Sequence, residues 1–330
     1  MMIQWTLLIS LISLGAVSFA VTYLVVPWLM NALIRREITE KDLHRRGFPM
    51  VPTMGGVAVF AGFAAAMTLS AVLQMDYRLL FAVFLSGTLA VLAGAVDDLF
   101  RFSKASLVLL TFLISVPVIT FRAGTTLVYL TPIGPADFGW FFWVIVPFAF
   151  AFLMNGVNVY AGFNGLEVGL AAVSSISLGI CSIFYGSMES AAALFALSGA
   201  LLAFLKWNWF PARIFVGNSG TLLIGAVLAA GIITGTIKIV GIIALFPYII
   251  NFILRALDHF RSTVGDVEVM PDGTLKNGKL TALWACFMRR SSTEERTVVF
   301  RCILIQCVFG LLAVVFAYYH AGLVAALVGT

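Results

Sequence analysis

The chain is built from long apolar runs separated by short polar segments. Ten runs are each long enough to cross about 30 Å of hydrocarbon, and they cover about residues 4–33, 55–74, 79–96, 105–121, 139–155, 168–185, 189–205, 219–234, 239–257 and 298–327. Inside a bilayer every backbone N–H and C=O must be paired within the protein, so each run is predicted to be a helix. We therefore expect an all-α fold, a polytopic membrane protein of about ten transmembrane helices that forms a single domain over residues 1–330.

Two polar segments interrupt this helical pattern. Residues 122–138 combine threonine, valine and tyrosine with turn-forming proline and glycine, which predicts a short outer β-hairpin. Residues of about 258–297 form one long cytoplasmic loop, in which the pair Asp272-Gly273 marks a turn. Because this loop lies beside other polar loops, we interpret it as a substrate lid or specificity element and not as a second domain.

Composition agrees with the pattern of apolar runs. Hydrophobic residues make up 62% of the 330 positions and charged residues 11%, and the mean hydropathy is +1.06, which excludes a soluble domain of this length. The first run carries no basic residue before Arg35 and is too long for the apolar core of a signal peptide, so we interpret it as a retained span. The net charge of +5 is interpreted as the basic excess of a cytoplasmic face, and no nucleic-acid partner is expected.

Basic residues are divided unequally between the two sets of loops. If the first span runs from outside to inside, seventeen of the twenty lysines and arginines fall in one set, and only Arg78, Arg122 and Lys238 fall in the other. The positive-inside rule then places both termini outside, with an even number of spans. Twelve of the fifteen acidic residues also fall on the basic side. Because the rule says little about acids, their position indicates a cation or phosphate site on the cytoplasmic face.

The cysteines and His44 receive structural interpretations. The four cysteines form no CxxC pair, and three of them lie within or beside apolar runs, so small buried side chains are favoured over metal ligands or disulfides. His44 lies in the first basic loop with no second histidine near it in the sequence, so a solvated loop histidine is favoured over a metal ligand.

One polar stretch lies between the fifth and sixth apolar runs, at residues 155–169, and reads NGVNVYAGFNGLEVG. Asn155, Asn158 and Asn164 offer neutral oxygen and nitrogen groups, and the glycines allow the backbone to approach a phosphate or a sugar closely. We interpret the stretch as a binding site for a polar ligand. An ordinary turn at the membrane edge is the alternative interpretation.

Two adjacent carboxylates end the third apolar run. Asp97 and Asp98 lie at its inner end, where they are costly unless they meet cations, water or a proton. Helix capping explains them poorly, because the C-terminus of a helix favours cations. A functional role is therefore favoured, and Arg101 and Lys104 follow closely enough to compensate the charge or to hold a phosphate.

A glycine-flanked turn opens the eighth apolar run. The tetrapeptide Gly217-Asn218-Ser219-Gly220 precedes its apolar residues, and the free N–H groups of a helix N-terminus form a natural anion site. An N-cap role for Asn218 or Ser219 is equally compatible with this pattern, and it does not exclude the anion site.

The order of these motifs resembles that of the polyprenyl-phosphate N-acetylhexosamine-1-phosphate transferases, of the glycosyltransferase 4 type. The matching segments are KDLHRRGFPMVPTMGG, GAVDD, NGVNVYAGFNGLEVG and FPARIFVGNSGTLLIG, followed by a basic loop near the C-terminus. The central stretch is most similar to the eukaryotic and archaeal branch, because the bacterial pattern has aspartates where this chain has Ala161 and Asn164. The segment TLKNGKL, at residues 274–280, also resembles that branch. A ten-helix fold is implied.

The resemblance implies an activity as well as a fold. Such enzymes transfer N-acetylglucosamine 1-phosphate from UDP-N-acetylglucosamine (UDP-GlcNAc) to a membrane polyprenyl or dolichyl phosphate, release UMP and use Mg²⁺, with Mn²⁺ as an alternative metal. This reaction is the first step of lipid-linked glycan assembly. Phosphoryl transfer needs charge neutralisation and alignment more than covalent help from the protein. The site would face the cytoplasm, in the cell membrane of an archaeon or the endoplasmic reticulum of a eukaryote, and the partners would include membrane lipids and a second copy in a homodimer.

The resemblance also assigns roles to individual residues. Near the lipid phosphate it implies catalytic roles for Asp97, Asp98 and Lys104. It implies metal ligation by Asn158 and Asn218. The substrate-binding residues that it implies are Lys41, Asp42, Asn155, Asn164, Gly165, Leu166, Glu167, His259 and Arg261. The last two match the family's histidine-arginine motif with imperfect spacing.

Position 218 departs from the family pattern. The family has a Gly-Asp pair there whose aspartate binds Mg²⁺, whereas this chain has Gly217-Asn218. An asparagine oxygen can still bind a hard cation but contributes no charge. A natural variant, a weakened or silent relative, and a substitution that traps a complex all fit this residue.

Two other functions compete with the transferase. A secondary transporter places ionisable groups near the middle of the membrane on interrupted helices, whereas the acids here cluster at one membrane edge. A catalytically silent relative that binds lipid or nucleotide is favoured only by Asn218. UDP-GlcNAc and a polyprenyl or dolichyl phosphate are therefore the expected substrates.

Overall fold

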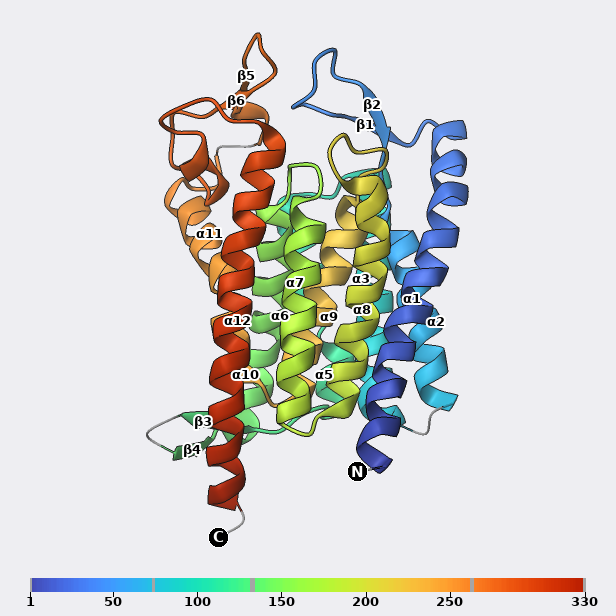
Figure 1. The fold of residues 1–330 in the computed structure, drawn as a ribbon, viewed down its shortest axis with the longest axis vertical. Helices are drawn as coiled ribbons and strands as arrows, with labels where there is room; N and C mark the ends of the chain where they lie inside the picture. The colour runs from blue at the N-terminus through green and yellow to red at the C-terminus, as the bar shows by residue number, and fades with distance from the viewer. Residues whose placement is uncertain (1, 73–74, 131–133, 262–263, 329–330) are drawn as a thin grey trace.

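The computed structural model describes residues 2–72, 75–130, 134–261 and 264–328. Figure 1 shows a bundle whose long helices run side by side along its longest axis. The helices are α1 (Met2–Arg35), α2 (Gly56–Val72), α3 (Tyr77–Phe100), α4 (Lys104–Leu113), α5 (Val116–Thr120), α6 (Gly139–Tyr160), α7 (Leu166–Phe184), α8 (Met188–Asn208), α9 (Gly217–Thr234), α10 (Lys238–Ala244), α11 (Phe246–Leu257) and α12 (Glu295–Val328), with short 3₁₀ helices η1 (Val264–Asp266) and η2 (Trp284–Phe287). The mainly helical fold agrees with the long apolar runs of the sequence.

Three antiparallel pairs of strands lie at the two ends of the bundle (Figure 1). The pair β1 (Thr39–Lys41) and β2 (Met50–Pro52) and the pair β5 (Glu268–Val269) and β6 (Leu275–Lys276) lie at one end, which we call the loop end. The pair β3 (Leu127–Leu130) and β4 (Gly134–Asp137) lies at the opposite end, in the segment where a hairpin was expected. The side of the membrane on which this pair lies stays a prediction.

The predicted count of ten transmembrane helices is not confirmed. Among the described residues, seven helices are long and apolar enough to cross a membrane, namely α1, α3, α6, α7, α8, α9 and α12. Helices α10 and α11 count as an eighth span only together, and they meet at an angle of 65°. Pro247 lies in the first turn of α11 and has no N–H to donate, so the helix breaks where the hydropathy continues. Helix α2 has only 17 residues, and α4 and α5 are both short.

Both ends of the chain approach the same end of the bundle. Helix α1 begins and helix α12 ends at the end that holds β3 and β4 (Figure 1). The first and last polar loops, which carry most of the basic residues, lie at the loop end. This arrangement agrees with an even number of membrane crossings.

Helix α9 lies in the middle of the bundle. Of its apolar stretch 89% is buried, compared with 28% for α1 and 33% for α12. Helices α2, α3, α6 and α8 pack around it. A helix that is apolar all round is expected in such a position, because no face of it meets solvent.

Small residues let α3 and α2 approach α9 closely. A Cβ added at Gly94 of α3 would lie 2.3 Å from the carbonyl oxygen of Asn218, and one at Gly56 of α2 would lie 2.1 Å from the backbone nitrogen of Gly220. Both contacts are with backbone atoms at the start of α9. The acidic pair of α3 lies one turn after Gly94, so this close approach brings the two carboxylates to the start of α9.

We expect Gly94→Ala to destabilise the protein, because the added methyl group meets backbone atoms that cannot move aside. Overpacking of this kind costs about 1–3 kcal/mol. Gly156→Ala on α6 is the matched control, since no neighbouring atom lies within 4 Å of its added Cβ. Thermal unfolding of the detergent-solubilised variants measures the effect. Equal unfolding temperatures for the two variants would show that the close packing of α3 on α9 does not constrain the fold.

Candidate active site

Loops from several parts of the chain meet at the loop end and enclose a polar cavity of about 230 Å³. The lining comes from the first loop, the end of α3, the end of α6, the segment between α6 and α7, and the start of α9. Seven residues predicted for the site line the cavity: Lys41, Asp42, Asp98, Asn158, Asn164, Glu167 and Asn218. The fold therefore brings motifs from four separate stretches of the sequence together.

Asp98 caps the start of α9 from a neighbouring helix. Its Oδ1 accepts a hydrogen bond from the backbone nitrogen of Asn218 at 2.7 Å, and its Oδ2 accepts one from that of Ser219 at 3.0 Å. The N-cap position belongs to Val216, which makes no side-chain capping bond, so neither Asn218 nor Ser219 is the N-cap residue. The anion-binding N–H groups predicted at this helix start thus bind a carboxylate of the protein itself.

Asn218 connects three helices through its side chain. Its Nδ2 donates to Asp97 Oδ2 at 2.7 Å, and its Oδ1 accepts from Asn158 Nδ2 at 2.9 Å. Asp97 is only 6% exposed, and its Oδ1 accepts from the backbone nitrogen of Phe102 at 2.7 Å. We call Asp97, Asp98, Asn158 and Asn218 the Asn218 cluster. These are the predicted acidic pair and the two predicted metal ligands.

The donor set of the Asn218 cluster suits a hard divalent cation. It offers two carboxylates and two amide oxygens, the ligand types that Mg²⁺ takes together with phosphate oxygens and water. In this arrangement the amide nitrogen of Asn218 faces Asp97, so its side chain must turn before its oxygen can share a cation with that carboxylate. Within the described part of the chain, no group of three or more His, Cys, Asp or Glu side chains is arranged to hold a metal ion. The protein atoms of the cluster that could bind a cation are therefore the carboxylate oxygens of Asp97 and Asp98 and the amide oxygens of Asn158 and Asn218.

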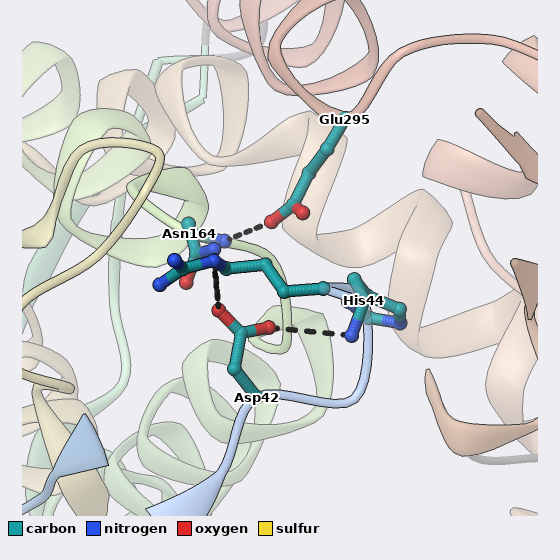
Figure 2. Close-up of polar contacts among 5 residues, drawn as sticks. Asp42, His44, Asn164 and Glu295 are labelled. Carbon is teal, nitrogen blue, oxygen red and sulfur yellow. Dashed lines mark hydrogen bonds and ion pairs between the residues drawn. The ribbon is translucent and has the colours of Figure 1, made fainter. Parts of the chain in front are cut away.

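Asn164 lies on the other side of the polar cavity and is held by two carboxylates (Figure 2). Its backbone nitrogen donates to Glu295 Oε1 at 2.7 Å, and its Nδ2 donates to Asp42 Oδ2 at 3.1 Å. Asp42 Oδ1 accepts from the backbone nitrogen of His44 at 3.2 Å, and Arg45 Nε lies 4.0 Å from its Oδ2. The first loop, the start of α7 and the start of α12 are thereby joined.

The prediction that His44 is a solvated loop histidine is wrong. The residue is 6% exposed, and its ring stacks on Phe163 with a centroid separation of 4.5 Å and an interplanar angle of 14°. Phe163 in turn meets Trp284 edge to face at 5.0 Å. Sequence neighbours gave no sign of these contacts, because Phe163 and Trp284 lie far from His44 along the chain.

Three neighbouring positions of the central stretch have different surroundings. Glu167 is buried and lines the polar cavity, and its Oε2 has no hydrogen-bond partner among the described residues. Gly165 has φ +83° and precedes α7, where an added Cβ would lie 2.9 Å from Trp209. Leu166 is 0% exposed. The structure does not bring Gly165 and Leu166 to the lining of the polar cavity, because they form the turn and the core behind it.

A second polar cavity, of about 320 Å³, lies next to the first and shares His44 with it. Glu295 and Asp272 are also among its lining residues. The hydroxyl and the backbone N–H of Thr274 donate to Asp272 and hold the pKa of that carboxyl below its ordinary value. Glu295 was not predicted as a site residue from the sequence. The only sequence signal for such a role was the position of this acidic residue just before the last apolar run.

An apolar cavity of about 650 Å³ adjoins the first polar cavity at Asn158, a member of the Asn218 cluster. Its walls are Lys104, Leu107, Val108, Phe112, Phe148, Ala151, Phe152, Asn155, Asn158, Val159, Ala161, Phe252, Arg255, Phe260 and Trp284. Asn158 and Ala161 line both this cavity and the first polar cavity. Within the Asn218 cluster, Asn158 therefore lies where a polar space and an apolar space meet, and Asp98 and Asn218 line the polar space.

Polar side chains occur at a few points of the apolar wall. Lys104 begins α4, and Asn155 joins α4 to α6, because its Nδ2 donates to Thr111 Oγ1 at 3.1 Å and to Ala151 O at 2.7 Å. Arg255 of α11 was not predicted as a site residue. Its Nε and Nη1 are buried with no hydrogen-bond partner in the described ranges. A single arginine in the last turn of an apolar run was its only signal, and such residues are common at membrane edges.

The structure does not bring His259 and Arg261 to the site. Both are exposed beyond the end of α11, and neither lines the polar or the apolar cavities. His259 Nδ1 lies 3.2 Å from the carbonyl oxygen of Leu257, within its own turn. The imperfect spacing of this motif and its exposed position both separate it from the rest of the predicted set.

Known proteins resemble this chain over most of its length. The sequence model of glycosyl transferase family 4 matches residues 80–236. A Saccharolobus solfataricus protein named "Putative UDP-N-acetylglucosamine--dolichyl-phosphate N-acetylglucosaminephosphotransferase" is 31% identical over 304 residues, which cover 91% of this chain and 94% of that protein. A Sulfolobus acidocaldarius protein of the same name is 29% identical over 311 residues, with the same coverage. A Desulforamulus reducens protein named "Phospho-N-acetylmuramoyl-pentapeptide-transferase" is 30% identical over 243 residues, which cover 66% of this chain and 71% of that protein.

We expect Asp98→Ala to destabilise the start of α9, because the N–H groups of Asn218 and Ser219 would lose their acceptor. Leaving such groups unpaired costs about 1–3 kcal/mol each. Asp98→Asn is the matched control, since its one remaining oxygen can still accept one of the two bonds. Thermal unfolding without substrate measures both variants. An alanine variant as stable as the unmodified protein would contradict a stabilising role for this cap.

Proposed function

Because the chain belongs to glycosyl transferase family 4, we propose that it transfers N-acetylglucosamine 1-phosphate from UDP-GlcNAc to a membrane polyprenyl phosphate of the dolichyl type and releases UMP. The observation that carries this proposal is that a polar cavity and an apolar cavity meet at Asn158, which donates a hydrogen bond to Asn218. The reaction joins a water-soluble sugar nucleotide to a lipid. A site for it needs such a boundary.

The apolar cavity supports binding of the lipid substrate. Phenylalanines of α4, α6 and α11 line it, and such a surface suits a polyprenyl chain. Lys104 and Arg255 are the cations of its wall. Arg255 carries N–H donors with no partner among the described residues, and a guanidinium of this kind forms strong bonds with phosphate. We assign the lipid phosphate to these two residues.

The first polar cavity supports binding of the sugar nucleotide. Lys41 supplies a cation at its edge, and Asn164 and Glu167 supply buried polar groups deeper in it. Gly162 and Phe163 of the loop between α6 and α7 also line this cavity. We assign the nucleotide to this cavity and its diphosphate to the side that holds Asn158 and Asn218.

Mg²⁺ is the proposed cofactor, with Mn²⁺ as the alternative, and the residues of the Asn218 cluster would hold it. When bound, such a cation neutralises charge on the diphosphate and on the leaving group. The protein contributes alignment: Asp98 fixes the start of α9, and Asp97 and Asn158 orient the side chain of Asn218.

The proposed phosphoryl transfer requires no strong base from the protein. An oxygen of the lipid phosphate attacks the β-phosphorus of UDP-GlcNAc, the bond from this phosphorus to the bridging oxygen breaks, and that oxygen leaves with UMP. A phosphate monoester with a second pKa near 6 is largely dianionic at neutral pH, so the nucleophile needs no deprotonation. Lys104 and Arg255 would orient the lipid phosphate, and Asp97 would act mainly by holding neighbouring groups in position.

The excess of basic residues at the loop end favours the cytoplasmic face of the membrane for this site.

Release of UMP tests the proposal directly. The purified protein is incubated with UDP-GlcNAc and a polyprenyl phosphate in the presence of Mg²⁺, and UMP is measured with each substrate omitted in turn. We expect release only when both substrates are present. A protein that binds both substrates but releases no UMP would be the silent relative that Asn218 favours, and one that binds neither would refute the proposed function.

We expect Asn218→Asp to raise the rate of UMP release and to lower the Mg²⁺ concentration for half-maximal turnover by about tenfold, equal to about 1.4 kcal/mol. The new carboxylate would face Asp97 Oδ2, which now accepts a bond from Asn218 Nδ2 at 2.7 Å. Two carboxylates at this distance repel each other unless a cation lies between them. Thermal stability should therefore become Mg²⁺-dependent in the variant. Identical metal dependence of rate and stability in both proteins would remove position 218 from the metal site.

A further inference from the structure

Asn164 is held by carboxylates from two distant parts of the chain. Asp42 lies in the first loop and Glu295 at the start of α12, and both point toward Asn164 in Figure 2. All three residues are nearly excluded from solvent, with exposed fractions of 3% for Asp42, 4% for Asn164 and 4% for Glu295. Water therefore competes little for these hydrogen bonds, and the contacts restrain Asn164 strongly.

The two carboxylates fix different parts of Asn164. Glu295 accepts from the backbone nitrogen, so it holds the chain just before α7. Asp42 accepts from Nδ2, so it decides which way the side-chain amide is turned. A carboxylate oxygen offers lone pairs, so the amide nitrogen and not the amide oxygen must face Asp42.

The amide oxygen of Asn164 is left as an acceptor. Oδ1 accepts no hydrogen bond from the residues that the structure describes, although the residue lines the first polar cavity. Asp42 cannot relax this orientation easily, because its own Oδ1 accepts from the backbone nitrogen of His44. The ring of His44 is in turn stacked on Phe163. One acceptor of fixed direction is therefore available to a ligand in this cavity.

We propose that Asp42 is a positioning residue that sets the base preference of the nucleotide site. The inference rests on the proposed function, which puts a nucleotide in this cavity. Asn164 Oδ1 accepts a hydrogen bond from the N3–H of a uracil base. The N3 of cytosine carries no hydrogen and is itself an acceptor, so it would face an oxygen with no bond between them. Buried polar groups left unpaired in this way reject the wrong ligand strongly.

This geometry predicts that Asp42→Asn reverses the orientation of the side-chain amide of Asn164. The backbone N–H of His44 still needs an acceptor, so the oxygen of the new amide stays with it, and the new NH₂ group faces Asn164. Asn164 must then turn its oxygen toward position 42 and present its NH₂ group to the cavity. The site then offers a hydrogen-bond donor to the base, and the N3 of cytosine can accept this hydrogen bond. Replacing Asp42 with alanine removes the restraint without reversing it.

The test measures binding of UMP and CMP to the full-length solubilised protein by isothermal titration calorimetry, and compares the ratio of the two dissociation constants between variants. We expect the unmodified protein to prefer UMP by about tenfold or more, the loss of one hydrogen bond being worth about this factor. In Asp42→Ala the preference should fall to near one. In Asp42→Asn it should reverse in favour of CMP. A purely structural role for Asp42 would weaken both nucleotides and leave the ratio unchanged.

Asp272→Asn serves as the matched control. Asp272 accepts hydrogen bonds from Thr274 within its own turn, at 2.9 Å and 2.6 Å, and it lines the neighbouring polar cavity without contacting Asn164. Its replacement should leave the UMP to CMP ratio as it is in the unmodified protein. If Asp42→Ala does not fold, the isosteric variant Asp42→Asn is sufficient to test the positioning role of Asp42. A ratio unchanged in Asp42→Asn overturns the inference.

The outcomes for the unmodified protein separate this inference from the proposed function. Equal binding of UMP and CMP overturns the role of Asp42, while UMP release from UDP-GlcNAc and a polyprenyl phosphate would still support the transferase. Binding of neither nucleotide removes the basis of both. A preference for UMP that survives in Asp42→Ala and Asp42→Asn overturns only the positioning role.

Discussion

The close packing of α3 against α9 is the constraint on which the rest of the site depends. Gly94 leaves no side chain between the two helices, so the acidic end of α3 lies directly over the first turn of α9. Asp98 and the backbone N–H groups of that turn are each costly to bury alone, and each satisfies the other. The most buried helix of the bundle therefore begins at a charged contact.

This contact decides where the proposed site lies. Because the start of α9 is fixed, Asn218 lies between Asp97 of α3 and Asn158 of α6, and its one side chain joins all three helices. Three members of this cluster line the polar cavity, and Asn158 also lines the apolar cavity. Carboxylates, amides and an apolar surface therefore lie close together there.

The position of Asn164 at the polar cavity depends on residues from distant parts of the sequence. Asp42 of the first loop and Glu295 at the start of α12 lie at the same end of the bundle, and they meet at Asn164. Buried carboxylates need hydrogen-bond donors or a nearby cation to compensate their charge. N–H groups of Asn164 donate to both carboxylates, and Asp42 also accepts from the backbone nitrogen of His44 and lies 4.0 Å from Arg45 Nε. Folding of the first loop, of the start of α7 and of the start of α12 is therefore coupled.

The sequence alone determined the helical class and membrane character of the protein, because unbroken apolar runs leave the backbone no other way to pair its polar groups. Motif order also predicted that Asp98, Asn158, Asn164 and Asn218 would lie together, and the structure places all four at the lining of one polar cavity. Tertiary structure decided the remainder. The burial of His44 and the hydrogen bond between Glu295 and the backbone of Asn164 depend on contacts between residues far apart in the chain. The positions of His259 and Arg261 outside the cavities also follow from the packing of the whole chain. Hydropathy and motif spacing depend only on residues that are close together in the sequence. They therefore carry no information on which distant side chains come into contact.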